Sequence, residues 1–152
     1  MLDMSFEEKS VWGSLVAMVV CSFYYFSEVL GMYADGGAPD PYRAGVLGIS
    51  LLIALIVIEI VYHSILAIGT RSTESDERDR WIETRASRNA YVALGVGTFG
   101  LVGHLVVGAH FGAPYLERLT DAFAIVNLLL LAMVIAEVVK YVSQIVYYRT
   151  GA

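Results

Sequence analysis

The sequence predicts an all-α integral membrane protein, a bundle of four transmembrane helices. Four long apolar stretches are separated by short polar segments, at about Val11–Leu30, Ala44–Ile68, Ala90–Phe111 and Ala122–Val146. Each stretch is long enough to cross a hydrocarbon core of roughly 30 Å at about 1.5 Å per residue. Barrel strands would alternate between apolar and polar residues, and these stretches do not. We expect one membrane domain over residues 1–152 and no soluble domain that could hold an enzyme.

The first two spans differ in what they carry. The first contains the only cysteine, Cys21, which we interpret as a small apolar residue because it has no partner for an internal disulfide. The second is apolar except for Glu59 and His63, late in its length. Ionisable groups are costly in lipid, so these two residues are functional candidates. Residues four apart share one face of a helix, so their side chains are expected to lie together.

A charged segment precedes the third span and is predicted to continue into it as one helix. Acidic residues favour the first turn of a helix, and no proline occurs from Glu74 to Ala109. We interpret the segment as a solvated helical face; the alternative is a surface that binds a cytoplasmic protein or lipid headgroups at residues 71–88. The charged residues proposed for this surface are Asp76, Glu77, Arg78, Asp79, Arg80, Arg85 and Arg88.

The third span carries a ridge of small residues around one histidine. Its members are spaced by four residues and are Gly100, His104, Gly108 and Gly112. Glycines at this spacing let another helix approach closely, so we expect a tight crossing within the bundle or across a dimer. His104 would then donate a hydrogen bond to a neighbouring carbonyl. The alternative is a haem ligand or quinone contact, although no second histidine lies at matching depth.

The fourth span adds Glu137 and Lys140, three residues apart and at a depth similar to Glu59 and His63. Three interpretations of these four residues stay open. The first is a structural network, in which a glutamate pairs with Lys140 and His63 bonds a carboxylate. The second is a proton or cation pathway. The third is a metal site built from both glutamates and His63, which the nearby lysine charge would oppose.

The distribution of basic residues predicts the orientation in the membrane, because lysine and arginine favour the cytoplasmic side. The central segment 71–88 carries five arginines, and Lys9 and Arg149 lie near the termini. The other two loops contain one basic residue each, Arg43 and Arg118. Both termini and the central segment are therefore expected in the cytoplasm.

The two halves of the chain share landmarks in the same order: an aromatic residue that opens a span, a Gly-Ala-Pro loop and a late glutamate. They are Trp12, Gly37–Pro39 and Glu59 in one half, and Tyr91, Gly112–Pro114 and Glu137 in the other. From aromatic residue to glutamate the spacing is 47 positions and 46 positions, respectively. We predict two homologous hairpins, residues 1–70 and 71–152, related by an axis along the membrane normal. Similar membrane-span patterns without duplication are the alternative.

The charged segment also carries a family resemblance. The string from Asp76 to Ile82, D-E-R-D-x-x-I, stands before a transmembrane helix and resembles a pattern in small uncharacterised prokaryotic membrane proteins. The resemblance covers residues 76–91 and the hydropathy profile. It implies a multi-pass protein of a bacterial or archaeal inner membrane. It adds no catalytic residue, because that family has no assigned activity.

These patterns exclude several functions and leave three. The net charge of −5 and the lack of a basic patch outside the central segment argue against nucleic-acid binding. No P-loop, Gly-x-Ser-x-Gly or Cys-x-x-Cys motif occurs, and no cofactor or metal is predicted. We expect a non-enzymatic accessory, sensory or scaffold protein, as a homodimer or a subunit of a larger membrane complex. The alternatives are a haem or quinone redox protein using His104, and a small proton- or cation-coupled transporter subunit that uses Glu59, His63, Glu137 and Lys140.

Overall fold

The described part of the structure, a computed structural model, is almost entirely helical. It covers residues 4–34, 40–69, 77–111 and 121–150, and no β-strand occurs among them. All four helices are long and apolar enough to cross a membrane, which confirms the predicted all-α fold with four spans. The helices are α1 (Phe6–Ala34), α2 (Pro41–Gly69), α3 (Glu77–Phe111) and α5 (Ala122–Thr150).

Polar residues cap the starts of three helices. The Glu8 N–H donates to the Ser5 hydroxyl at 3.0 Å, so α1 begins before its apolar stretch. Asp40 accepts the N–H groups of the first turn of α2, where Pro41 lacks a hydrogen to donate. Asp121 caps α5 in the same way. Such side-chain bonds satisfy amides that have no partner inside the helix, so α1 and α2 are longer than hydropathy alone predicts.

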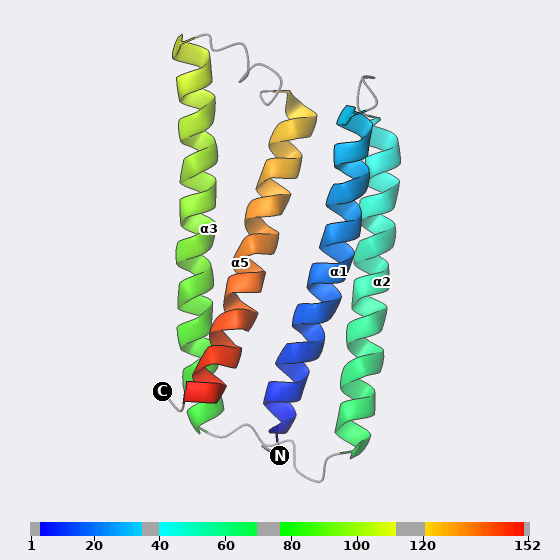
Figure 1. The fold of residues 1–152 in the computed structure, drawn as a ribbon, viewed down its shortest axis with the longest axis vertical. Coiled ribbons are helices and arrows are strands. Elements are labelled where there is room, and N and C mark those ends of the chain that lie inside the picture. The colour runs from blue at the N-terminus through cyan, green and yellow to red at the C-terminus, as the bar shows by residue number, and fades with distance from the viewer. Residues whose placement is uncertain (1–3, 35–39, 70–76, 112–120, 151–152) are drawn as a thin grey trace.

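The helices lie in a row, in the order α3, α5, α1, α2 (Figure 1). α1 packs against α2, α3 packs against α5, and the two inner helices α1 and α5 join the hairpins. The start of α1 and the end of α5 lie at the same end of the molecule as the end of α2 and the start of α3. Each half of the chain is thus an antiparallel hairpin. Duplication of the hairpin stays a prediction, since α1 is an inner helix and its predicted counterpart α3 is an outer one.

The contact between α3 and α5 is built from small side chains. Ile82 and Ala86 on α3 have no exposed surface, and Ala90 is 9% exposed. Farther along, a Cβ atom added to Gly97 would lie 2.9 Å from the Cβ atom of Ala132 on α5. Small residues let the two backbones approach, and close van der Waals packing is what holds helices together in lipid.

Helices α1, α2 and α5 form a second buried cluster, at the end away from the chain termini. Val29, Met32 and Ala44 are buried there, and Phe123 of α5 packs against them. Much of the remaining apolar side-chain surface is exposed; Phe23, for example, is 76% exposed. Lipid tails are as apolar as leucine, so such surface needs no covering by protein in a bilayer.

Candidate functional site

A network of hydrogen bonds joins α1 to α2 in the half of the molecule that contains the termini. His63 Nε2 lies 2.8 Å from Glu59 Oε2, and the Ser14 hydroxyl donates to the same oxygen at 2.8 Å. His63 Nδ1 lies 3.1 Å from the Ser10 hydroxyl. We call Ser10, Ser14, Glu59 and His63 the polar cluster. It contains two of the four ionisable residues that the sequence analysis singled out.

The spacing of these residues explains why they meet. Ser10 and Ser14 are four apart on α1, and Glu59 and His63 are four apart on α2, so each pair lies on one helix face. Because the helices run antiparallel, Ser10 faces His63 and Ser14 faces Glu59. Ser14 is buried, while the side chains of Glu59 and His63 are 28% and 40% exposed. The two serines thus provide nearby polar partners for an ionisable pair on an otherwise apolar helix.

The hydrogen bonds of the polar cluster are compatible with either protonation state of His63. With neutral His63, the Ser10 hydroxyl donates to Nδ1 and the Nε2–H donates to Glu59. With protonated His63, both ring N–H groups donate, and the Ser10 oxygen accepts instead. Histidine is the side chain whose charge changes most readily near neutral pH. The arrangement therefore suits proton exchange as well as structural pairing.

The predicted partners on α5 join this site only indirectly. Lys140 Nζ lies 4.0 Å from Glu137 Oε2, which is an ion pair but too long for a hydrogen bond. Tyr141 of α5 lies within electrostatic range of both Glu59 and Glu137. The described bonding partners of Glu59 are Ser14 and His63 rather than Lys140. α1 lies between α2 and α5, and the hydrogen bonds described for the polar cluster join α1 to α2.

The sequence analysis missed Ser10, Ser14 and Tyr141. A serine in an apolar helix is a weak signal, because its hydroxyl can bond the carbonyl four residues earlier in its own helix. The useful signal was the matching four-residue spacing on two neighbouring antiparallel helices. Among the described residues, no group of three or more His, Cys, Asp or Glu side chains is placed to hold a metal ion. Glu137 therefore does not complete a metal site with Glu59 and His63.

Tyr62 closes one side of the polar cluster. Its hydroxyl donates to the Lys9 carbonyl at 2.6 Å, and its ring stands edge-on to His63. A Cβ atom added to Gly13 would lie 2.1 Å from the Tyr62 ring. Glycine at this position is what allows the tyrosine to reach across to α1.

The glycine ridge on α3 lies beside the face of that helix that packs against α5. Nothing lies within 4 Å of a Cβ atom added to Gly100, so this glycine is not at a tight crossing within the chain. Gly100 and His104 instead line a pocket of about 310 Å³ between α3 and α5. His104 Nε2 is buried without a hydrogen-bond partner among the described residues, so the expected bond to a carbonyl is not formed at that nitrogen. Gly108 is half-buried, and Gly112 lies outside the described residues.

The charged start of α3 is fastened to the end of α5. Tyr148 donates to Asp79 at 3.0 Å, and the Arg78 guanidinium donates to the Tyr148 carbonyl at 3.4 Å. Asn89 donates to both Ser143 and Tyr147. Asp79 is half-buried, and Asp76 lies outside the described residues. The other predicted charged residues are exposed, namely Glu77, Arg78, Arg80, Arg85 and Arg88.

An ion pair that was not predicted ties α1 to α5 at the same end. Arg149 Nε lies 2.5 Å from Glu8 Oε1, whose side chain is 11% exposed. The two groups form an ion pair but not a hydrogen bond, because no donor reaches Glu8 Oε1 at a hydrogen-bonding angle. Glu8 lies ahead of the apolar stretch, where the sequence analysis sought no intramembrane group.

Comparisons with known proteins found no matching family model, no similar curated protein and no similar solved structure.

Proposed function

We propose that this chain is a non-enzymatic scaffold or sensory protein of a prokaryotic inner membrane. Its charged helix start, on the cytoplasmic side, would bind another subunit of a membrane complex. The observation that carries this proposal is the continuity of α3, a single 35-residue helix from Glu77 to Phe111. A charged surface on such a helix is fixed rigidly to a membrane span. A rigid surface is better suited to bind a partner than a flexible linker would be.

The contacts with α5 support the same proposal. Asp79 and Asn89 point toward α5 and hydrogen-bond it, while Arg80 and Arg88 are exposed. The helix thus has one face for its own bundle and one face left for a partner with complementary charges. Charge pairs between subunits favour the right partner and exclude others more than they add affinity.

The test replaces Arg80 and Arg88 together with glutamate and measures the size of the complex in native membranes by blue native electrophoresis. We expect the wild type to migrate as a complex larger than one chain and R80E/R88E to lose the additional mass. Arg43→Gln is the matched control, because it changes a basic residue at the opposite end. A wild type that migrates as one chain, or a complex unchanged in R80E/R88E, would contradict the proposal.

A second candidate is a proton-coupled transporter subunit, which the polar cluster favours. Its bonds from Ser10 through His63 and Glu59 to Ser14 form a chain along which a proton can pass. Tyr141 of α5 lies within electrostatic range of Glu59, at one end of that chain, and of Glu137. Such relays of carboxylate and histidine inside membranes are typical of proton pathways.

This second candidate is tested in liposomes that contain a pH-sensitive dye. After an acid pulse outside, a proton pathway predicts faster internal acidification with wild-type protein than with empty liposomes. Glu59→Gln should abolish the difference, whereas Glu28→Gln, in the other half of α1 and paired with Arg43, should retain it. Equal rates for Glu59→Gln and wild type would exclude Glu59 from such a pathway.

A further inference from the structure

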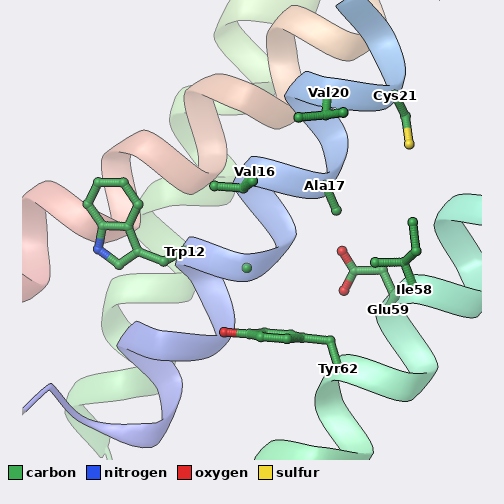
Figure 2. A pocket seen from close by; sticks show the side chains of 9 residues that line it. Trp12, Val16, Ala17, Val20, Cys21, Ile58, Glu59 and Tyr62 are labelled. Carbon is green, nitrogen blue, oxygen red and sulfur yellow. The ribbon is translucent and has the colours of Figure 1, made fainter. Parts of the chain in front are cut away.

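A pocket of about 480 Å³ lies between α1 and α2, beside the polar cluster. Figure 2 shows Glu59 and Tyr62 projecting into it from α2, while Val16 and Val20 line it from α1. Val16 is 56% exposed and Val20 is 61% exposed, so the pocket opens sideways toward the surrounding membrane. Its volume is in the range of roughly 300–1,000 Å³ that is typical of small-molecule sites.

The walls combine apolar side chains with one carboxylate. Val16, Val20 and Ile58 provide aliphatic surface, and Trp12 and Tyr62 add aromatic rings at one end. Glu59 is the single carboxylate in the lining. Aromatic faces attract cations, as does a carboxylate in surroundings of low dielectric constant. Apolar walls around one anionic group fit an apolar molecule that carries one positive charge.

The carboxylate of Glu59 has capacity left for a ligand. Its Oε2 atom accepts from Ser14 and contacts His63, while no described hydrogen bond reaches its Oε1 atom. Ser10 can donate to Nδ1 of a neutral His63, so the glutamate need not be balanced by an imidazolium charge. A carboxylate accepts through two oxygens, and only one of the two is occupied here.

We propose that this pocket binds a lipophilic cation dissolved in the membrane, with its charge at Glu59 and its apolar body between α1 and α2. Glu59 lies ten residues before the end of α2, which is roughly 15 Å along a helix. A 29-residue helix extends beyond a core of roughly 30 Å by only about 7 Å at each end. Glu59 therefore lies inside the hydrocarbon layer, below the amines of phospholipid headgroups.

The experiment titrates tetraphenylphosphonium onto the protein in nanodiscs and follows the fluorescence of Trp12, with Trp81→Phe as the background. We expect saturable binding that empty nanodiscs lack, and binding of neutral triphenylphosphine oxide at least ten-fold weaker. Glu59→Gln should weaken cation binding at least ten-fold, and Glu59→Asp should restore part of it. Glu137→Gln is the matched control, because Glu137 lies outside this pocket.

A second variant keeps the test valid if Glu59→Gln fails to fold. Val16→Phe leaves the polar cluster intact and fills the pocket, so it should also weaken binding at least ten-fold. Absence of saturable binding, equal binding of the neutral compound, or normal binding by both Glu59→Gln and Val16→Phe would overturn the proposal. The site does not rest on the scaffold function: R80E/R88E should bind the cation normally, so the two proposals can fail separately.

Discussion

The polar residues inside the spans are satisfied by small partners on the next helix. Glu59 and His63 contact each other, and each also hydrogen-bonds a serine of α1. An unpaired charge in lipid would cost far more than such bonds contribute, since interhelical hydrogen bonds in bilayers average only about 0.6 kcal/mol. The serines therefore make an otherwise costly pair tolerable and add little stability beyond that.

Sequence reasoning could identify the two residues of this cluster that are costly to place in lipid, but not the serines that bond them. A glutamate and a histidine in an apolar stretch stand out because lipid penalises them. Ser10 and Ser14 carry no such penalty, so their role depends on which helix α1 packs against. That choice is a property of three-dimensional packing, and hydropathy does not determine it.

At Gly13, one added methyl group tests the fit between α1 and α2. Gly13→Ala places a Cβ atom 2.1 Å from the Tyr62 ring, so the ring must move and give up its bond to Lys9. We expect a loss of about 1–3 kcal/mol, as is usual when a packed site is overfilled. Thermal unfolding in detergent is the measurement.

Gly31→Ala is the control for that substitution, because an added Cβ atom there meets nothing within 4 Å on the same helix α1. It should unfold at or above the wild-type temperature. Adding Tyr62→Ala to Gly13→Ala removes the obstructing ring and should leave no further cost for the extra methyl group. Equal stability of Gly13→Ala and Gly31→Ala would mean that the two helices are not this close.

Among the helices, α3 has a glycine pattern that indicated a close helix contact but did not identify the face of α3 that makes it. The buried face runs through Ile82, Ala86 and Leu101, with the close approach at Gly97. Gly100 and His104 lie beside that face and border a pocket. Spacing by four residues marks a stripe on a helix, but it does not say which neighbouring helix the stripe meets. The long uninterrupted helix, in contrast, followed directly from the absence of proline.

Two leucine substitutions on α3 separate packing inside the chain from packing between chains. Gly97→Leu should destabilise strongly, because its side chain would collide with Ala132 on α5. Gly100→Leu has room within the chain and should leave the unfolding temperature of a single chain nearly unchanged. If the expected dimer uses the glycine ridge, Gly100→Leu should instead reduce the oligomer size measured by light scattering. A Gly97→Leu protein as stable as wild type would contradict the crossing described here.

In the whole molecule, the four helices form an open row whose two halves meet through α1 and α5. One contact between these two helices is the ion pair between Glu8 and Arg149. Arg149→Met leaves Glu8 buried without its partner, so we expect a cost between about 1 kcal/mol, typical of exposed pairs, and about 3 kcal/mol, typical of buried ones. The double variant Glu8→Gln with Arg149→Met should regain much of that loss in a chemical unfolding series. A double variant as unstable as the sum of the two single ones would show that the residues act independently.

The number and type of helices could be predicted from the sequence because lipid imposes them on any long apolar stretch. The pairing of the spans into two hairpins was predicted from landmarks that recur in both halves, and the paired helices are in contact. The row order could not be predicted, because side-chain shape decides which faces of equally apolar helices meet. The orientation in the membrane rests on the distribution of arginine and lysine, and the proposed scaffold function depends on it.

Labelling from the two sides of the membrane tests that orientation most directly. In a Cys21→Ser background, one cysteine is placed at Tyr42, at the start of α2, or at Glu77, at the start of α3; both residues are exposed and lie at opposite ends of the molecule. An impermeant maleimide added to intact cells should label the cysteine at Tyr42, and the cysteine at Glu77 should react only after the cells are opened. Labelling of Glu77 but not Tyr42 in intact cells would put the charged start of α3 outside and would contradict the account.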